Sequence, residues 1–540
     1  MRETDQGRAS PSTVDTSQPP SHRDPDLDSM PFRSILFGGV GINAEVEDQA
    51  APEFFRDLNL DQVVAGITES WEDYNLTPFF YARLSDLDAI GYRQEIMGDF
   101  SDSRLTQAVH LFAAAMRAMR ERLKRATELY YKYAMERAFL GAAEIYWQAA
   151  QELSSELTAL DLHSRGLRAF RKYLTEYVNS SSFRKLVVDG QRVITDLSNI
   201  SYSLLMKDDS ITVRHDDGEN DYSTTVEETF AKFWRQKDND HGAKVPVPDS
   251  MNHIQAQILE RLALLFADIF RSLEEFSTTR RDFQDDVLVR FDREIQFYVS
   301  YLKYADKLKA DGLRFCLPVL SRTSKEVSGR NTFDIALAQK LVAEKGSVVT
   351  NDFFLSGPER IFVVSGPNQG GKTTFARTFG QLHYLASLGC PVPGTQARLF
   401  LYDNMFAHFE REETITNLRG KLHDDLVRIR TILDHATPNS IVIMNEIFSS
   451  TTLRDAVFLS KKVMAKMDAI GLLGVWVTFL DELASFSEKT VSIVSIVDPH
   501  DLAVRTFKLE RRSADGLAYA HAIAEKHRVT YGRLKERIKA

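Results

Sequence analysis

The stretch Ile361-Phe-Val-Val-Ser-Gly-Pro-Asn-Gln-Gly-Gly-Lys-Thr-Thr374 contains the clearest functional signal in this chain. An apolar, β-branched run enters a glycine-rich turn, and Lys-Thr-Thr then opens a predicted helix from Phe375 to Leu388. The stretch satisfies G-x-x-x-x-G-K-[ST], in which backbone N–H groups and a helix N-terminus surround a polyphosphate. It therefore predicts a phosphate-binding loop, with Lys372 reaching the β- and γ-phosphates and Thr373 contacting Mg²⁺. A chance glycine turn is the alternative, and the complete pattern in a strand–turn–helix context disfavours it.

A second polar site follows a later apolar strand. Ser440-Ile-Val-Ile-Met444 leads directly into Asn445 and Glu446. In phosphate-loop ATPases a carboxylate within one water of the γ-phosphate orients the attacking water, and Glu446 is our candidate for that catalytic role. Asn445 can bond a metal-bound water through its amide oxygen, although it lacks the charge that helps to hold Mg²⁺. The alternative for Glu446 is a strand-end carboxylate with a purely structural partner.

Length and composition restrict the class of protein. At 540 residues the chain is too long for one compact core, so several domains are expected. Its two cysteines, Cys316 and Cys390, cannot form a disulfide framework and indicate a reducing compartment, which favours the cytoplasm. We find neither a signal peptide nor an apolar run long enough for a membrane helix, so no membrane partner is expected. The net charge of -9 argues against a protein that coats nucleic acid through bulk charge, but not against a local basic surface.

Periodicity divides the chain into five regions. Residues 1–30 are polar and predicted to be disordered. Residues 31–312 form a predicted helical domain, with a β-containing insertion at about 183–250 that includes a hairpin from Tyr202 to Val213. A connector at 313–348 leads to an α/β domain at 349–515, and residues 516–540 form a C-terminal helical segment. The predicted strands of the α/β domain, expected to form a parallel sheet covered on both faces, are Ile361–Val364, Ala397–Tyr402, Ser440–Met444, Gly474–Thr478 and Val491–Val497.

A basic, tyrosine-rich segment lies within the helical domain. It contains Arg117, Arg120, Arg122, Lys124, Arg125, Lys132 and Arg137, together with Tyr130, Tyr131 and Tyr133. Such a segment could follow a DNA backbone. It could equally be the solvated face of a long helix, and we favour this second interpretation because nearby glutamates partly balance its charge.

Several motifs together resemble the ATPase domain of the MutS mismatch-repair family. They are Asn351-Asp352, Ser365-Gly-Pro-Asn-Gln-Gly-Gly-Lys-Thr-Thr374, Leu385-Ala-Ser-Leu-Gly-Cys-Pro-Val-Pro393 and Asn445-Glu-Ile-Phe-Ser-Ser-Thr-Thr-Leu-Arg-Asp455. The specific similarity covers about residues 349–500, and the helical region resembles the lever and clamp of MutS only in order and character. The resemblance implies an ABC-type P-loop ATPase domain that acts as a dimer, preceded by a lever that relays nucleotide-driven closure to DNA.

The resemblance also implies roles for individual residues. The ATP-binding loop comprises Gly366, Pro367, Asn368, Gln369, Gly370, Gly371, Lys372, Thr373 and Thr374. Thr373 and, through water, Asn445 are expected to serve Mg²⁺, while Glu446 positions the attacking water. Asn351 occupies the position that approaches adenine in the family, and Asp455 the position of a dimer contact. The implied cofactors are ATP and Mg²⁺.

The chain departs from the MutS pattern at four places. Asn445 replaces an aspartate, and Phe479 stands where the family has a switch histidine. The usual signature is replaced by Leu418-Arg-Gly-Lys-Leu-His-Asp-Asp425, and the residues before the helical region are too few for a mismatch-reading domain. The insertion is acidic around Asp208, Asp209, Asp216 and Asp217, which disfavours phosphate contact there. Because Asn445, Phe479 and the replaced signature all affect the ATPase machinery, we expect slow hydrolysis of ATP or none.

Three functions remain open at this point. The leading hypothesis is a MutS-like, ATP-dependent DNA-binding protein that acts as a homodimer in mismatch repair or recombination-related repair, with ATP switching its grip on DNA. The first alternative is an ATP-switched protein-interaction scaffold without a DNA ligand. The second is a stalked ABC ATPase of chromosome maintenance, for which the stalk is too short and irregular.

Overall fold

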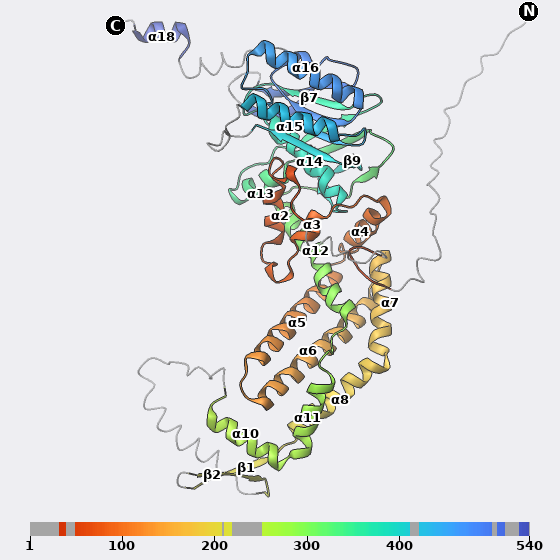
Figure 1. Ribbon diagram of the computed structural model, residues 1–540, viewed down its shortest axis with the longest axis vertical. Coiled ribbons are helices and arrows are strands. Elements are labelled where there is room, and N and C mark those ends of the chain that lie inside the picture. The colour runs from red at the N-terminus through yellow and green to blue at the C-terminus, as the bar shows by residue number, and fades with distance from the viewer. Residues whose placement is uncertain are drawn as a thin grey trace, which may run out of the picture.

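A computed structural model of the chain shows an elongated molecule, with an α/β half at one end and long helices extending from it (Figure 1). The structure describes residues 32–38, 49–207, 210–218, 251–410, 421–498, 505–513 and 529–538. The predicted disordered tail, Asp208, Asp209 and residues 418–420 of the replaced signature lie outside these ranges. Among the described residues, no helix is both long enough and apolar enough to cross a membrane.

Helices build the first half of the chain. They are α2 Leu60–Thr68, α3 Thr77–Tyr81, α4 Leu87–Asp99, α5 Ser103–Glu128, α6 Lys132–Ala159, α7 Arg165–Asn179, α8 Ser181–Ser198, α10 His253–Leu265, α11 Ala267–Thr279 and α12 Asp286–Lys309, with short 3-10 turns η2 Glu53–Phe55 and η3 Glu72–Tyr74. Serine caps separate the middle helices, because Ser164 accepts a hydrogen bond from the Leu167 N–H and Ser180 accepts one from the Phe183 N–H. Residues 103–179 form three helices, α5, α6 and α7.

The far end of the helical half carries the predicted hairpin. Strands β1 Tyr202–Lys207 and β2 Ser210–His215 pair in antiparallel register, which confirms the expectation for this segment. A small apolar cluster beneath them joins Val213 to Leu262, Phe266 and Phe270 of the neighbouring helices. Helix α8 extends to Ser198, so the change from helix to strand comes about fifteen residues later than the expected start of the insertion at 183.

A six-stranded sheet forms the centre of the α/β half, in the order β10-β11-β12-β7-β13-β14. Its strands are β7 Ile361–Ser365, β10 Met405–Phe409, β11 Ile441–Asn445, β12 Leu473–Val477, β13 Thr490–Val497 and β14 Arg505–Arg511. The first five are parallel, and β14 pairs antiparallel with β13. Strands β10 and β14 were not predicted from the sequence.

Helices cover both faces of this sheet, as its near-continuous apolar strands require. Alternate side chains of β11 separate the two layers, with Ile443 in the core shared with α14 Lys372–Ser387 and Met444 in the core beneath α15 Lys421–His435 and α16 Leu453–Ile470. A 3-10 turn, η4 Asp481–Leu483, follows β12, and α18 Tyr531–Ile538 lies near the C-terminus (Figure 1).

A second, four-stranded sheet corrects one expectation. The predicted strand at Ala397–Tyr402 is β9 Gln396–Phe400, and it pairs with β4 Val319–Ser321 and β5 Val327–Thr332 rather than joining the central sheet. Strand β6 Asn351–Leu355 completes the order β4-β9-β5-β6, while β3 Phe315–Cys316 pairs with β8 Val392–Pro393. The stretch expected to be a connector, 313–348, therefore contributes strands to this sheet, together with α13 Ile335–Ala343.

Candidate nucleotide-binding site

The glycine-rich loop connects β7 to α14 at the carboxyl edge of the central sheet. Gly366 and Gly371 have φ values of 117° and 91°, and Gln369 also has a positive φ, 58°. The loop lies tightly against β13, because a Cβ atom on Gly370 would be 2.3 Å from Ser495 Oγ. Ser495 Oγ donates a hydrogen bond of 2.6 Å to the Gly370 carbonyl. These observations explain the glycines. A side chain at Gly366 or Gly371 would be strained by the positive φ, and a side chain at Gly370 would collide with Ser495.

Lys372 is buried beneath the loop. Its Nζ donates hydrogen bonds of 3.0 Å to the carbonyl oxygens of Gly366 and Pro367. The ammonium also lies 3.8 Å from Glu446 Oε1 and 4.4 Å from the centre of the Phe479 ring. Burial lowers the pKa of Lys372, and the Glu446 carboxylate acts in the opposite direction. The structure thus brings together Lys372 and Glu446, which are 74 positions apart in the sequence.

Oxygen donors from two elements meet beside the lysine. Thr373 Oγ1, in the first turn of α14, donates a hydrogen bond of 2.8 Å to Asn445 Oδ1 at the end of β11. Glu446 follows with a positive φ of 51°, and its N–H donates to the Val477 carbonyl at 2.9 Å. A hydroxyl, an amide oxygen and a carboxylate are hard donors of the kind that Mg²⁺ accepts alongside its waters. The residues present therefore fit a magnesium ion.

The hairpin of β13 and β14 forms the opposite wall of the loop. Arg505 Nε donates to the Asn368 carbonyl at 3.1 Å, and the Phe507 backbone lies next to Gly371. Phe507 has a φ of 57° and is 47% exposed. Asn351 Nδ2 donates to the Phe507 carbonyl at 3.1 Å, and Asn351 Oδ1 accepts the Leu509 N–H at 2.9 Å. The Asn351 amide therefore supports β14 next to the loop.

Two further acidic residues, Asp455 and Glu410, have different settings. Asp455 is exposed in the first turn of α16, where its carboxylate accepts a hydrogen bond of 2.8 Å from Thr452 Oγ1. Glu410, directly after β10, binds Lys421 and accepts a hydrogen bond of 2.7 Å from Ser449 Oγ, and these two contacts, Lys421 first, lower its pKa. Because Ser449 is three residues after Glu446, Glu410 holds the loop that follows the candidate catalytic carboxylate.

Sequence reasoning missed Ser495, Arg505, Phe507 and Glu410 as parts of this region. They belong to no local motif, and three of them lie more than 120 positions from the glycine-rich loop. In the sequence, only the alternation of Ser495 with apolar residues in β13 indicated that this polar side chain has a specific partner.

Some residues of the basic segment of α5 and α6 make internal contacts. Arg120 forms an ion pair with the buried Asp292 of α12, and Arg122 lies over Gly141 of α6. Lys132 pairs with Glu274 of α11 at 2.6 Å. Four basic positions are at the surface of α5: Arg117, Arg122, Lys124 and Arg125 are exposed.

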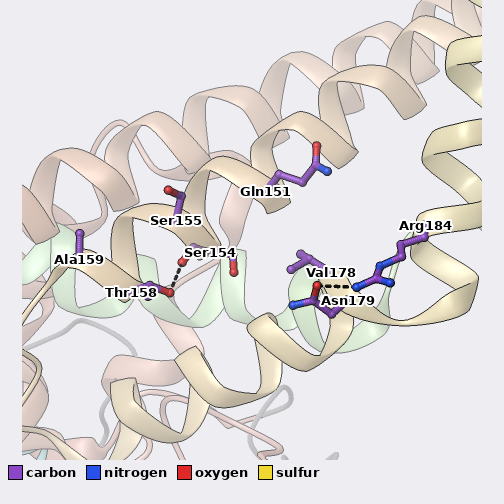
Figure 2. A pocket seen from close by; sticks show the side chains of 8 residues that line it. All are labelled: Gln151, Ser154, Ser155, Thr158, Ala159, Val178, Asn179 and Arg184. Carbon is purple, nitrogen blue, oxygen red and sulfur yellow. Dashed lines mark hydrogen bonds between the residues drawn. The ribbon is translucent and has the colours of Figure 1, made fainter.

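A separate polar hollow of about 540 Å³ lies far from the loop, between α6 and the joint of α7 and α8 (Figure 2). Arg184 beside it donates a hydrogen bond of 2.9 Å to Asn179 Oδ1, and the remaining lining includes Gln151 and Ser154. Its only charged side chain is thus already engaged within the protein.

A parallel sheet, a glycine-rich loop with a buried lysine and a strand-end carboxylate together define a P-loop nucleotide-binding fold. Residues 362–529 match the family model described as MutS domain V, which confirms the resemblance of this region to the MutS family.

Several curated relatives match part of the chain. Endonuclease MutS2 of Thermus thermophilus is 31% identical over 180 residues, which are 33% of this chain and 24% of the relative. DNA mismatch repair protein MutS of Petrotoga mobilis is 30% identical over 140 residues, or 26% and 17% of the two chains. DNA mismatch repair protein MutS 2 of Halobacterium salinarum is 27% identical over 203 residues, or 37% and 22%. The matches span about a quarter or less of each relative.

Proposed function

We propose that this protein binds ATP and Mg²⁺ at the glycine-rich loop and acts as a MutS-like, DNA-binding homodimer in mismatch repair or recombination-related repair. The observation that carries the proposal is the assembly of Lys372, Thr373, Asn445 and Glu446 at one edge of the sheet, with Thr373 and Asn445 in direct contact. The relatives named above are DNA mismatch repair proteins and an endonuclease, which supports a DNA substrate.

The chemistry of ATP hydrolysis assigns a task to each of these residues. The N–H groups of the loop and the α14 N-terminus hold the phosphates, and Lys372 neutralises the terminal ones. A magnesium ion would neutralise charge on the β- and γ-phosphates, held by Thr373 and, through water, by Asn445. Glu446 would orient the attacking water from its position near Lys372. Because Asn445 is neutral, we propose weak magnesium binding and slow turnover.

The base end of the nucleotide is proposed to lie over Phe507. The ring is half exposed next to the start of α14, and an exposed aromatic ring is a platform on which a purine can stack. Asn351 holds the Phe507 carbonyl, so we propose that Asn351 serves the adenine site by fixing this ring.

Helix α14 offers a rigid connection from the nucleotide to the helical half. Its N-terminus forms the phosphate site, whereas Tyr384 OH near its C-terminus donates to the Phe80 carbonyl at 2.7 Å. Between them Gln381 Nε2 donates to the Leu58 carbonyl at 2.9 Å, and just beyond α14 the Leu388 carbonyl accepts from Arg93 Nη1 at 3.0 Å. A nucleotide that moves the start of α14 would therefore act on the helices, which supports ATP as a switch for DNA grip.

The alternative, a nucleotide-switched scaffold without DNA, is favoured by one observation. Two basic residues of α5 that could have followed a DNA backbone, Arg120 and Arg122, are engaged with α12 and α6. We therefore propose that DNA contact also uses a basic surface on α8.

One experiment tests nucleotide binding and DNA binding together. We expect the wild-type protein to retain labelled ATP with Mg²⁺, and Lys372→Ala to lose that retention because the buried ammonium is removed. Glu446→Gln keeps the shape of the side chain but removes its negative charge, so it should trap the ATP-bound dimer, detected by size-exclusion chromatography with light scattering.

The same proteins are then assayed on mismatched, branched and plain duplex DNA over a salt series. Nucleotide-dependent retention supports the leading function. No retention at low salt, with or without ATP, would favour the scaffold. If the wild type shows no turnover and Glu446→Gln changes neither dimer lifetime nor nucleotide release, Glu446 has no catalytic role.

A further inference from the structure

Phe479 occupies an unusual place for a large apolar side chain. It follows the buried strand β12 by two residues, and its neighbours Thr478 and Leu480 are both buried. The Thr478 N–H donates to the Val364 carbonyl at 3.0 Å, and Thr478 Oγ1 accepts the Leu480 N–H at 3.1 Å, so the backbone of this turn is held from both sides. Phe479 is nevertheless 54% exposed, and its ring lies 4.4 Å from Lys372 Nζ.

The contacts of Lys372 show which direction the ring covers. An ammonium has three N–H donors. Lys372 Nζ donates to the carbonyls of Gly366 and Pro367 at 3.0 Å, and its longest contact is to Asn368 Oδ1 at 3.5 Å. The ammonium also faces the Phe479 ring and Glu446. The long contact to Asn368 is the weakest of the three, so this donor is the one most readily given up to the terminal phosphates.

An aromatic ring and a phosphate therefore compete for the Lys372 ammonium. The ring attracts the ammonium through its quadrupole, but it has no polar hydrogen with which to bind a phosphate oxygen in return. Both nucleotides bring a β-phosphate to the lysine, whereas only ATP adds a γ-phosphate on the Glu446 side. Loss of the ring contact would thus cost more affinity for ATP than for ADP.

We propose that Phe479 is a positioning residue that acts through Lys372 as a gate at the γ-phosphate position, lowering the affinity of the site for ATP relative to ADP. This inference rests on the proposed ATP-binding function and deepens it. One side chain, which need not touch the nucleotide, would then set the ratio of ATP to ADP affinity.

The test compares the affinities of wild type, Phe479→Ala, Phe479→Leu and Phe479→Trp for ATP and for ADP by calorimetric titration with Mg²⁺. A partly exposed cation–π contact corresponds to about a 2- to 5-fold change in affinity, so Phe479→Ala should raise the ratio of ATP to ADP affinity by about that factor. Phe479→Leu keeps apolar bulk without a ring and should resemble Phe479→Ala. Phe479→Trp, with the strongest ring, should lower the ratio.

The outcomes distinguish this inference from the function beneath it. If wild type binds neither nucleotide, the proposed function and the gate both fall. If wild type binds ATP and the ratio stays constant across all four proteins, the gate alone is wrong. A rise in ATP affinity for Phe479→Ala with none for Phe479→Leu would also overturn it, because bulk rather than the ring would then be responsible. Thermal unfolding of each variant confirms that it is folded.

Discussion

At the residue scale, Asn445 is the main chemical departure in the candidate site. Its amide oxygen accepts the Thr373 hydroxyl hydrogen at 2.8 Å, so the geometry expected of a magnesium shell is present without the negative charge. The side chain is mostly buried at the end of β11, where a charge would act on a nearby ion with little screening.

Asn445→Asp should strengthen the dependence of ATP binding on Mg²⁺. A unit charge near a divalent ion at a partly buried site is worth more than about 1 kcal/mol, so we expect the Mg²⁺ midpoint to fall at least about fivefold. The measurement is a Mg²⁺ titration at fixed ATP. Asn439→Asp adds the same charge at the exposed start of β11 and should leave the midpoint unchanged. Equal midpoints for Asn445→Asp and wild type would exclude Asn445 from the metal shell.

At the scale of single elements, α8 carries exposed basic residues of its own. Lys185 and Arg192 are exposed and seven residues apart, which places them on one face of the helix. Arg192 has only a distant partner, Asp196 at 3.8 Å, so its charge remains accessible to solvent. We propose this face as the site of DNA backbone contact.

The double variant Lys185→Glu/Arg192→Glu should weaken retention on DNA and flatten its salt dependence. Each lost phosphate contact reduces the slope of log affinity against log salt by about 0.9, so two contacts remove about 1.8. The matched control, Arg430→Glu/Lys466→Glu, makes the same charge change on exposed residues of the α/β half. Identical slopes for the two double variants would show that α8 does not contact DNA.

At the scale of the whole molecule, a buried carboxylate links the first described segment to a distant helix. Glu294 of α12 accepts hydrogen bonds from Ser34 Oγ at 2.8 Å and from the Ile35 N–H at 2.9 Å. Arg93 lies in the same region and donates to the carbonyls of Leu36 and Leu388 at 3.0 Å each. Residues 32–38 are therefore held between the helical half and the end of α14.

This arrangement predicts a pH-dependent stability. Burial raises the pKa of Glu294 from 4.5 to about 7, against the opposing hydrogen bonds from Ser34, Ile35 and Leu36. The pKa of Glu294 is higher in the folded protein than in the unfolded chain. The contribution of Glu294 to the free energy of unfolding is therefore complete below about pH 4.5 and is lost as pH rises through 7. The shift corresponds to a loss on the order of 3 kcal/mol.

Glu294→Gln removes this titration while keeping an acceptor for the N–H groups. From pH 5 to 7.5 the free energy of unfolding of the wild type should fall relative to that of Glu294→Gln, as measured by urea unfolding. The exposed Glu176→Gln is the control and should follow the wild-type curve. Parallel curves for wild type and Glu294→Gln would mean that Glu294 is ionised throughout.

Local patterns in the sequence were sufficient for much of this architecture. The strand, glycine turn and helix around Lys372 were predictable because backbone conformation there follows from neighbouring residues. The β1–β2 hairpin was predictable for the same reason. The largely apolar strands β7, β11, β12 and β13 indicated a sheet that is buried on both faces.

Tertiary structure alone decided which distant residues meet. Strand β9 has the same local pattern as the central strands, and only its pairing partners placed it in the second sheet. The positions of Ser495 and Phe507 beside the loop, and of the Phe479 ring over Lys372, depend on strand order and on turns far apart in the chain. Local sequence specifies conformation through short-range sterics and periodicity, whereas these contacts arise only when the sheet closes and brings its carboxyl ends to one edge.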